Sequence, residues 1–515
     1  MRKRWHKLAA IPLALTFVAA ACSGDDEASD GGDSTEAVAD DTDAAGADTA
    51  ADATEGTTAD ATTAEGTAAE GTTAEGTTAE GTAADGTTAE GGSAPPVSVS
   101  VAAAPEVGDF GGAEVTVTGP ERAENEAGAI QAVLGAFGEA NNIEITYTGD
   151  ADWEANINTQ VAGGNPPSIS IFPQPGKLAD FAREGNVVPL SEEALASATE
   201  NWSEDWLRYG NVDDEQYGVP VKSDLKSLVW YQPARFEADG YEVPETFEEF
   251  TALVEEMAAA GGPKPLCVGI ESGQATGWPF TDWTEDMVLR QHGPEVYDQW
   301  VGHEIPFNDP QIVESMQTVL DIWTEENVYS SSGSIAATAF QDNGTPLVNG
   351  DCYMHRQANF YGAFFPEGTV YADGSEGAVD VFYFPDINGD RPVLGAGTLA
   401  AGFNDEDATM AVLAYMATAD YATARQGAQA ELTGGEGTVS GFLSAAQGQD
   451  ESVYTPLEQS FLEILNTSEI FRFDASDLMP ADVGAGTFWT EGVKAVTGDA
   501  TAEEAADAIE ESWPD

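Results

Sequence analysis

The chain contains 515 residues, of which 91 are acidic and 18 are lysine or arginine, and its formal net charge at pH 7 is −73. A charge of this size and sign argues against nucleic acid and anionic membrane surfaces as partners. It is typical of a solvated acidic surface, and it carries no information about a small ligand.

The amino-terminal 22 residues have the pattern of an export signal. Four basic residues in the first seven positions precede the mostly apolar segment 8–18, which leads into "AAAC". This apolar stretch is too short to span a bilayer, so we expect residues 1–22 to be a signal peptide. Cys22 follows the small-residue site and resembles the lipid-modified cysteine of a bacterial lipobox, although Ala19 stands where leucine is usual. The alternative is an ordinary cleaved signal that leaves Cys22 as a spare thiol.

The next segment lacks the apolar residues that a core requires. Residues 23–100 consist mostly of Ala, Thr, Gly and acids, with an acid at every fifth position from Glu55 to Glu90. Such a composition cannot bury enough apolar surface to fold. We therefore expect residues 23–110 to be a disordered acidic tether.

Apart from the lipobox cysteine, the chain contains one pair of cysteines. The chain has three cysteines, and lipid on Cys22 would leave Cys267 and Cys352 free to oxidise outside the cytoplasm. They lie 85 positions apart, so a bond between them would close a long loop and stabilise the fold by roughly 4 kcal/mol. The alternative is a pair of buried thiols.

The rest of the chain alternates between short strands and helices. Strand patterns lie at 113–119, 143–149 and 168–172, and helix patterns at 121–140 and after 151 separate them. Strand, helix and strand at this spacing indicate parallel βαβ units.

Beyond the turn-rich segment 217–224, the pattern resumes with a strand at 226–231. Thr246 then caps a helix that Gly261 ends, and Asp309 opens another whose apolar stripe makes Trp323 a core residue. A strand at 378–385, a return crossing at 391–403 and helices at 405–432, 454–466, 487–497 and 501–513 complete the chain.

About 400 residues are too many for one ordinary core, so an α/β fold with two lobes is expected. We assign lobe 1 to 111–222 and its return to 385–435, and lobe 2 to 223–384 and its carboxyl-terminal helices to 436–515. Several crossings between lobes predict a cleft there, where ligands of α/β proteins bind.

No catalytic or metal-binding pattern emerges from the sequence. Asp282, Glu285 and Asp286 could share a helix face as a glycosidase pair would, but in so acidic a chain such a cluster is more often a solvated face. "GIESG" and "GTVSG" have the wrong spacing for a serine hydrolase, and no histidine cluster suits zinc. "DINGDR" fits an Asn-Gly turn better than a calcium loop. We expect no enzyme activity, cofactor or metal.

Aromatic residues next to single polar groups form the remaining signal. They fall mostly at predicted strand ends and loops, whereas core aromatics follow the period of an element. Indole faces can cover the apolar face of a sugar ring while Asp, Arg and Asn pair with its hydroxyls. For any single aromatic a place in the core is equally compatible with the pattern. The predicted ligand contacts are Asp152, Trp153, Phe172, Gln174, Asp224, Trp230, Trp278, Asp282, Arg356, Asn359 and Trp489.

Six segments, in this order, resemble the lipid-anchored solute-binding proteins of carbohydrate ABC importers, and most closely the α-glucoside branch. They are "TGDADWEANINTQVAGGNPPSISIFPQPG", "VPVKSDLKSLVWY", "GIESGQATGWPFTDWTEDMVLR", "EIPFNDP", "CYMHRQANF" and "GAGTFW". The resemblance covers about residues 112–513. It implies the type II periplasmic-binding-protein fold, with a hinge of crossing segments and a cleft that closes on sugar.

The resemblance also implies roles and partners. Except for Trp230, the residues proposed above to contact ligand match the family's contact positions, and Cys267 and Cys352 resemble a pair often bridged in this branch. The implied ligand is a disaccharide such as trehalose, maltose or sucrose, delivered to a membrane permease. We expect a monomer, lipid-anchored on the outer face of the cell membrane. The alternatives are a secreted glycosidase, a cell-surface lectin without a transport role, and a binding protein for a peptide or polyamine.

Overall fold

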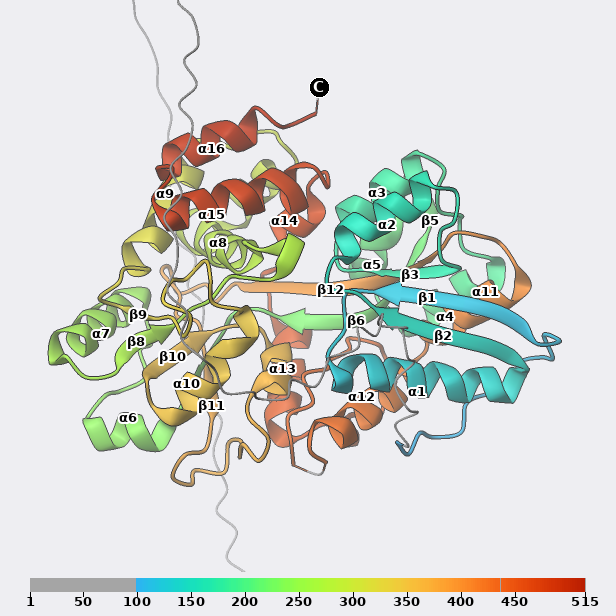
Figure 1. The fold of residues 1–515 in the computed structure, drawn as a ribbon, viewed down its shortest axis with the longest axis horizontal. Helices are drawn as coiled ribbons and strands as arrows, with labels where there is room; N and C mark the ends of the chain where they lie inside the picture. The colour runs from blue at the N-terminus through green and yellow to red at the C-terminus, as the bar shows by residue number, and fades with distance from the viewer. Residues whose placement is uncertain (1–98, 436, 515) are drawn as a thin grey trace, which may run out of the picture. The chain divides into compact units, whose positions relative to one another are not determined.

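A computed structural model describes residues 99–435 and 437–514 of the chain. The predicted signal peptide, the predicted lipidation site Cys22 and most of the predicted tether lie outside these residues. The described part consists of two α/β lobes, lobe 1 and lobe 2, joined by crossing strands (Figure 1). Among the described residues, no helix has the length and apolar character needed to cross a membrane.

Lobe 1 is built on three parallel strands, β1 (Ala113–Gly119), β2 (Ile143–Gly149) and β3 (Ile169–Phe172). β1 lies between the other two and pairs with β2 along its whole length. Alternate residues of β2 are buried, because successive side chains of a strand point to opposite faces, whereas β3 is buried on both faces.

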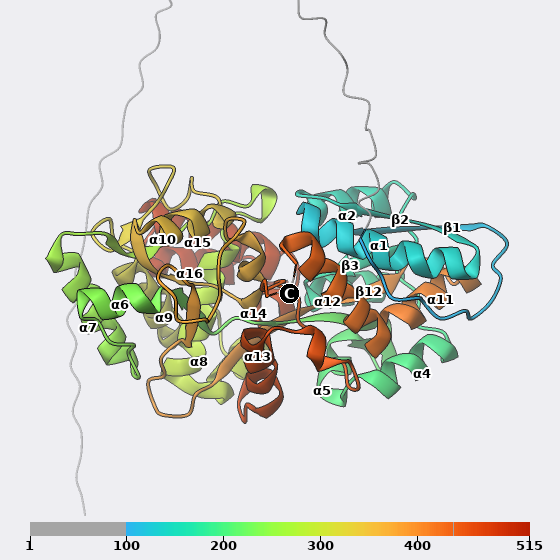
Figure 2. The same ribbon diagram turned by 90° about the horizontal axis from the view of Figure 1, so that it is seen from below.

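Helices cover both faces of the lobe 1 sheet (Figures 1 and 2). α1 packs on β2 and α12, while α11 packs on α4. The helices are α1 (Glu124–Asn141), α2 (Trp153–Ala162), α3 (Pro175–Arg183), α4 (Glu192–Asn201), α5 (Glu204–Leu207), α11 (Asp407–Met416) and α12 (Ala419–Thr433). A two-stranded ribbon, β4 (Asn211–Val212) and β5 (Glu215–Gln216), completes the lobe.

Two long antiparallel strands join the lobes. β6 (Gly218–Leu225) leads into lobe 2, and β12 (Val393–Gly402) returns to pair with β3. β13 (Phe471–Phe473) pairs with the first residues of β12. All residues of β6 and β12 are buried, so both crossing strands run through the interior of the molecule.

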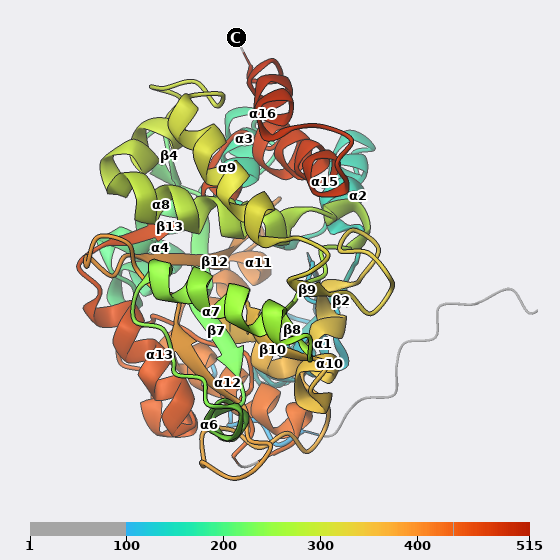
Figure 3. The ribbon, with the colours of Figure 1, turned by 90° about the vertical axis from the view of Figure 1, so that its left-hand side faces the viewer.

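Lobe 2 contains a mixed sheet in the order β11 (Asp380–Tyr383), β7 (Leu228–Tyr231), β10 (Cys352–Arg356), β8 (Lys264–Cys267) and β9 (Val328–Tyr329). α7 packs against β8, as seen from the lobe 2 side in Figure 3. The helices are α6 (Pro233–Asp239), α7 (Phe247–Ala260), α8 (Trp278–Val301), α9 (Pro310–Ile322), α10 (Gly344–Asn349), α13 (Pro456–Thr467), α14 (Ala475–Leu478), α15 (Trp489–Thr497) and α16 (Ala502–Glu510).

Several local predictions are confirmed. Thr246 caps α7 in a capping box, Gly261 ends the helix in a left-handed conformation, and Asp309 caps α9. Trp323 is buried in the core of lobe 2. These signals are local, so the sequence alone carries them.

Two local predictions are wrong. The predicted helix at 405–432 is two helices, because the Thr418 hydroxyl accepts a hydrogen bond from Tyr421 N at 3.0 Å and starts α12 anew. The segment 217–224, predicted as turns, contains most of strand β6. β6 pairs with the strand β12 on one edge, and on its other edge the bridge from Ser223 to Leu443 leaves Pro220 outside the pairing.

Residues 99–112 lie along lobe 1, although the sequence assigns most of them to the tether. Asn141 holds this segment, because its side-chain Oδ1 accepts hydrogen bonds from Val107 N at 2.6 Å and Gly108 N at 3.1 Å. Its backbone carbonyl accepts another from Phe110 N at 3.0 Å. Asn141 is fully buried under these contacts, so this part of the predicted tether is packed on the lobe.

Candidate functional site

A cavity of about 400 Å³ lies between the lobes, within the range of small-molecule sites. Lobe 1 supplies the start of α1 and the loops before α2 and α3, the crossing strands supply one wall, and lobe 2 supplies α8, α14 and two aromatic turns. Its lining residues are Pro120, Glu121, Arg122, Ala123, Glu126, Ala151, Glu154, Pro173, Gln174, Lys222, Asp224, Lys226, Ser272, Ala275, Trp278, Asp282, Phe340, Gln341, Phe360, Phe364, Ala396, Gly397, Thr398, Asp474, Ser476, Asp477 and Trp489.

Lobe 2 lines the cavity with a cluster of aromatic rings. The ring of Trp278 meets Phe340 edge to face at 5.0 Å and Phe360 at 6.0 Å between centroids. Phe364 lies 5.6 Å from Phe340 and 6.3 Å from Phe360. Trp278 is only partly buried, so it can present apolar surface to a ligand in the cavity.

Gly277 brings Trp278 and Trp489 together at the start of α8. Its φ of 118° favours glycine, and a β-carbon at this position would collide with the backbone carbonyl of Trp489. The glycine therefore permits α15 to approach the first turn of α8, which places both indoles in the cavity wall.

Lys226, just beyond β6, is buried between two carboxylates of the lobe 2 side. Its Nζ donates to Asp282 Oδ1 at 2.8 Å and to Asp474 Oδ2 at 2.6 Å. Burial alone would lower the pKa of Lys226, but these two carboxylates outweigh it and hold the pKa well above its ordinary value. The lysine is therefore charged, and two of its three N–H donors are bonded to carboxylates.

The two carboxylates share this one cation unequally. Asp474 also accepts hydrogen bonds from Ser476 Oγ and Asp477 N, both at 2.8 Å. Burial favours its neutral form, but Lys226 and these bonds keep the pKa of Asp474 below its ordinary value. Burial raises the pKa of Asp282 to about 7, which Lys226 only partly opposes.

A second lysine in the wall, Lys222 on β6, has the same kind of surroundings. Its Nζ lies 3.5 Å from both Glu121 Oε1 and Asp224 Oδ1, and Arg425 approaches the same Glu121 oxygen at 3.3 Å. Burial raises the pKa of Asp224 above its ordinary value. Burial, assisted by the charge of Glu121, raises the pKa of Glu126 to about 7.

Five buried polar atoms in the cavity wall have no hydrogen-bond partner among the described residues. They comprise acceptors and donors on both sides of the cleft, and all five belong to residues with exposures of 6% or less. A buried polar group without a partner costs about 1–3 kcal/mol, so a polar ligand would recover this energy. The atoms are Gln174 Oε1, Asp224 Oδ1, Asp282 Oδ2, Thr398 Oγ1 and Trp489 Nε1.

The structure places five of the eleven predicted contact residues in the cavity wall. These are Gln174, Asp224, Trp278, Asp282 and Trp489. Asp152 lies exposed at the start of α2, where a β-carbon added to Gly273 of lobe 2 would lie 3.4 Å from its carboxylate. Asp152 is therefore beside the cavity and not in its wall.

Three predicted aromatic contacts are not supported by the structure, because their rings are buried in the cores. Trp153 is 1% exposed and donates its indole N–H to Ser170 Oγ at 3.0 Å. Phe172 is fully buried in the same cluster of lobe 1. Trp230 is fully buried in lobe 2 and donates to the carbonyl of Gln357 at 3.0 Å. Their neighbours in the sequence are polar, but their strand and helix positions point them inward.

Arg356 and Asn359 also lie behind the wall, where Arg356 contacts α8 and Asn359 contacts the end of β6. Arg356 Nη2 donates to Asp286 Oδ2 at 2.6 Å, and its Nη1 is 4.0 Å from Asp282 Oδ2. Asn359 Oδ1 accepts from Leu225 N at the end of β6 at 2.6 Å, and its Nδ2 donates to Gly441 O at 3.2 Å. Both side chains support cavity residues without lining the cavity.

Most of the charged residues in the cavity wall were not predicted from the sequence. The cavity is also lined by Lys222 and Lys226, from segments predicted as turn and strand, and by Asp474 and Asp477, from a segment for which no element was predicted. One signal was present, since lysine is rare in this chain and two lysines flank "SDL" in "VKSDLKS". The contribution of Asp474 depends on the pairing of β13 with β12, which no local pattern encodes.

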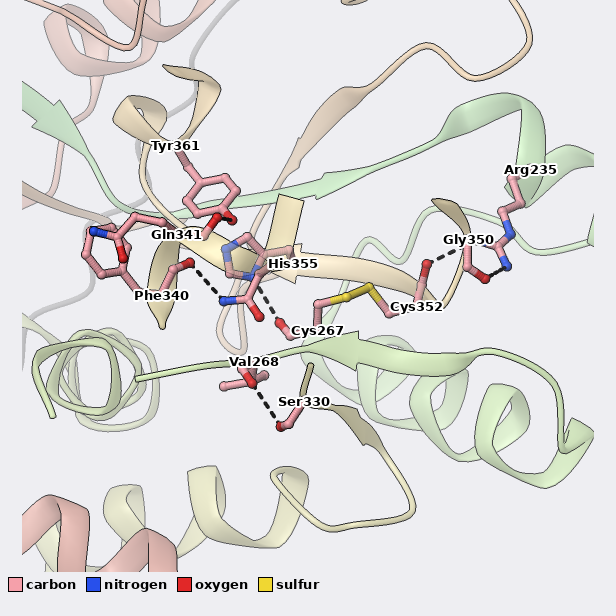
Figure 4. The surroundings of a disulfide bond; sticks show 11 residues. Arg235, Cys267, Val268, Ser330, Phe340, Gln341, Gly350, Cys352, His355 and Tyr361 are labelled. Atoms are coloured by element: carbon pink, nitrogen blue, oxygen red, sulfur yellow. Dashed lines mark hydrogen bonds between the residues drawn. A yellow bond between two sulfur atoms is a disulfide. The ribbon is translucent and has the colours of Figure 1, made fainter. Parts of the chain in front are cut away.

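A disulfide anchors the segment that leads to Trp278. Cys267 ends β8 and is bonded to Cys352 at the start of the adjacent parallel strand β10, with 5.6 Å between their α-carbons (Figure 4). Arg235 donates to the carbonyls of Cys352 at 3.1 Å and Gly350 at 2.6 Å. His355 Nδ1 lies 2.9 Å from the Cys267 carbonyl. Burial lowers the pKa of His355 to about 4, so this imidazole is neutral at pH 7.

The cavity differs from a metal centre. Among the residues that the structure describes, no group of three or more His, Cys, Asp or Glu side chains is arranged to hold a metal ion. Two lobes, crossing strands and an interlobe cavity with unpaired polar atoms define a solute-binding protein of the two-lobed periplasmic type.

Comparison with known proteins assigns the family. Residues 122–423 match the model of the bacterial extracellular solute-binding proteins, and the chain belongs to this family. It is 39% identical over 414 residues to the osmoprotective compounds-binding protein GgtB of Synechocystis sp., covering 79% of this chain and 94% of GgtB. It is 38% identical over 423 residues to the α-glucosides-binding periplasmic protein AglE of Rhizobium meliloti, covering 79% and 88% of the two chains.

Solved structures share the fold. The bacterial solute receptor AcbH superposes with a TM-score of 0.65 at 19% identity, over 78% of this chain and 98% of that chain. Maltose-bound MalE3 of T. maritima gives a TM-score of 0.58 at 17% identity, with the same coverage. These similarities confirm the predicted two-lobed α/β fold and the predicted family. The chain is a binding protein and not an enzyme.

Proposed function

We propose that the interlobe cavity binds a carbohydrate, and that its natural ligand is an α-glucoside disaccharide of the trehalose, maltose or sucrose type. The observation that carries this proposal is the set of five buried polar atoms that lack a hydrogen-bond partner among the described residues, around one aromatic cluster. A sugar ring has an apolar face for Trp278 and a rim of hydroxyls that can both donate and accept. Gln174, Asp224 and Asp282 supply acceptors, and the Trp489 indole supplies a donor.

The size of the cavity and the relatives support a disaccharide. A cavity of about 400 Å³ lies in the lower part of the range for small-molecule sites. AglE is named for α-glucosides and GgtB for osmoprotective compounds, and both align over most of their length. A non-transport lectin of the cell surface and a peptide or polyamine carrier remain the alternatives.

The mechanism follows from the two-sided wall. Lobe 1 contributes Gln174 and lobe 2 contributes Trp278, Asp282 and Trp489, so ligand contacts are complete only when the lobes approach each other. A ligand that needs both sets of contacts shifts the hinge equilibrium toward the closed form. We propose that the closed protein delivers sugar to a membrane permease, and that Cys22 carries the lipid that holds the protein outside the membrane.

A thermal-shift screen of the purified protein tests the proposal. The panel contains monosaccharides, α- and β-linked disaccharides, amino acids, short peptides and polyamines. A ligand that binds only the folded state with micromolar affinity raises the free energy of unfolding by about 4 kcal/mol at millimolar concentration. A rise confined to α-linked glucosides is the expected result. A rise with peptides or polyamines only would contradict the proposal.

A further inference from the structure

The cavity wall contains more carboxylates than cations. Seven acidic side chains line it (Glu121, Glu126, Glu154, Asp224, Asp282, Asp474 and Asp477), against Arg122, Lys222 and Lys226. Both lysines are already held between pairs of carboxylates. Arg122 is exposed at the rim, where solvent screens its charge.

The cations behind the wall do not balance the excess of carboxylates in the wall. Arg356 approaches Asp282 Oδ2 only to 4.0 Å, and it pairs at 2.6 Å with Asp286, which lies outside the cavity. Arg425 pairs with Glu121, which also faces Lys222. Lys177 bonds to the Glu154 backbone carbonyl at 3.2 Å and faces Asp180 and Asp482 as well.

The surplus is concentrated where α8 meets α14. There Asp282 Oδ2 is a buried oxygen of the wall without a hydrogen-bond partner among the described residues, and Arg356 Nη1 lies 4.0 Å from it. Burial, and then the charge of Asp474, raises the pKa of the Asp477 carboxyl well above its ordinary value. Burial also raises the pKa of Glu154, which faces Asp477 from lobe 1. The excess of carboxylates at this site can be neutralised by one more positive charge or by bound protons.

We infer that the cavity accepts a glycoside that carries a protonated amino group, with the ammonium lying beside Asp282, Asp474 and Asp477. This inference rests on the proposed carbohydrate function. An ammonium group donates charge-assisted hydrogen bonds to carboxylates, and it is attracted to aromatic faces such as that of Trp278. The hydroxyls of the sugar pair with the other polar atoms of the wall, and its apolar face packs on the aromatic cluster.

Isothermal titration at pH 7.5 with matched ligands tests this inference. The probes are trehalose and maltose, their monoamino derivatives at each carbon that can carry the amine, and the N-acetylated form of every amine. The N-acetyl compound keeps the position and removes the charge. We expect at least one amine to bind about tenfold more tightly than its N-acetyl form, because a charge-assisted bond in a dry site has about this effect.

Two variants assign the effect to the surplus carboxylates. Asp477→Asn removes a wall carboxyl whose side chain makes no protein hydrogen bond among the described residues, and Asp405→Asn removes an exposed one after β12. The preference for the amine should fall several-fold in Asp477→Asn and stay unchanged in Asp405→Asn. An unchanged preference in Asp477→Asn would overturn the inference.

The outcomes separate the two proposals. If trehalose or maltose binds and no amine exceeds its N-acetyl form, the inference is overturned while the carbohydrate function stands. If neither the sugars nor their amines bind, the carbohydrate function is overturned together with the inference.

Discussion

Trp278 is the side chain that combines most of the features of the cavity. It is partly buried, it packs on two phenylalanine rings, and Lys226 Nζ lies 5.8 Å from its ring. Trp278→Ala should weaken sugar binding by about 2–3 kcal/mol, roughly 100-fold, because it removes the aromatic surface in contact with the sugar.

The matched control for this change is Trp513→Ala. Trp513 stacks on His303 at 4.0 Å, away from the cavity. Titration calorimetry with α-glucosides compares the two variants with the parent protein. Equal affinities for Trp278→Ala and Trp513→Ala would show that Trp278 does not contact the ligand.

The raised pKa of Glu126 predicts how the free energy of unfolding depends on pH. Its pKa in the folded protein is raised from 4.5 to about 7, chiefly by burial. A raised folded pKa means that the carboxyl stabilises the fold when protonated, and that this contribution is lost as the pH rises through about 7. Glu126→Gln keeps the neutral shape, so stability should fall less between pH 5.5 and 8 than in the parent, by at most about 3 kcal/mol.

Urea unfolding at both pH values measures this difference. Glu144→Gln, on the exposed side of β2, is the control and should leave the slope with pH unchanged. Identical slopes for Glu126→Gln and the parent protein would show that Glu126 is ionised throughout.

At the scale of elements, the junction of α8 and α15 depends on Gly277. Gly277→Ala adds a β-carbon against the Trp489 carbonyl in a left-handed backbone conformation. We expect a loss of about 3 kcal/mol in the free energy of unfolding, with weaker sugar binding because Trp278 and Trp489 both shift. Gly164→Ala has a similar positive φ of 70° but open space around it, so it should cost about 1 kcal/mol and leave binding unchanged. Equal costs for the two variants would contradict the close contact.

The disulfide between β8 and β10 should contribute to stability through its long loop. Replacing Cys267 and Cys352 with alanine together removes a link between residues 85 positions apart, and should lower the free energy of unfolding by about 4 kcal/mol. Denaturant melts of the double variant against the oxidised parent measure this effect. A change of less than about 1 kcal/mol would show that the adjacent strands need no link.

The features of helices and strands that the sequence predicted are those that depend on neighbouring residues in the chain. The capping of α7 by Thr246 and the core position of Trp323 follow from nearby residues, and both are confirmed. The strand β6 was missed because it contains Pro220, and only its pairing with β12 makes it a strand. Trp153 and Trp230 were misplaced because polar neighbours do not reveal which way a ring points.

For the whole molecule, the family and the two-lobed fold could be predicted because long motifs keep their order along the chain. The charged wall could not, since Lys226, Asp282 and Asp474 are brought together from segments separated by 56 and 248 positions. Such a triad depends on the packing of α8 and α14 of lobe 2 against the end of the crossing strand β6. It was therefore visible only in the structure.

A crystal structure of the complex with trehalose or maltose would show whether the interlobe cavity is the sugar site. We expect sugar in this cavity, with a ring face on Trp278 and hydroxyls within hydrogen-bond distance of Asp224 Oδ1 and Asp282 Oδ2. Sugar bound elsewhere, or sugar in the cavity that leaves these two oxygens without a partner, would contradict this expectation.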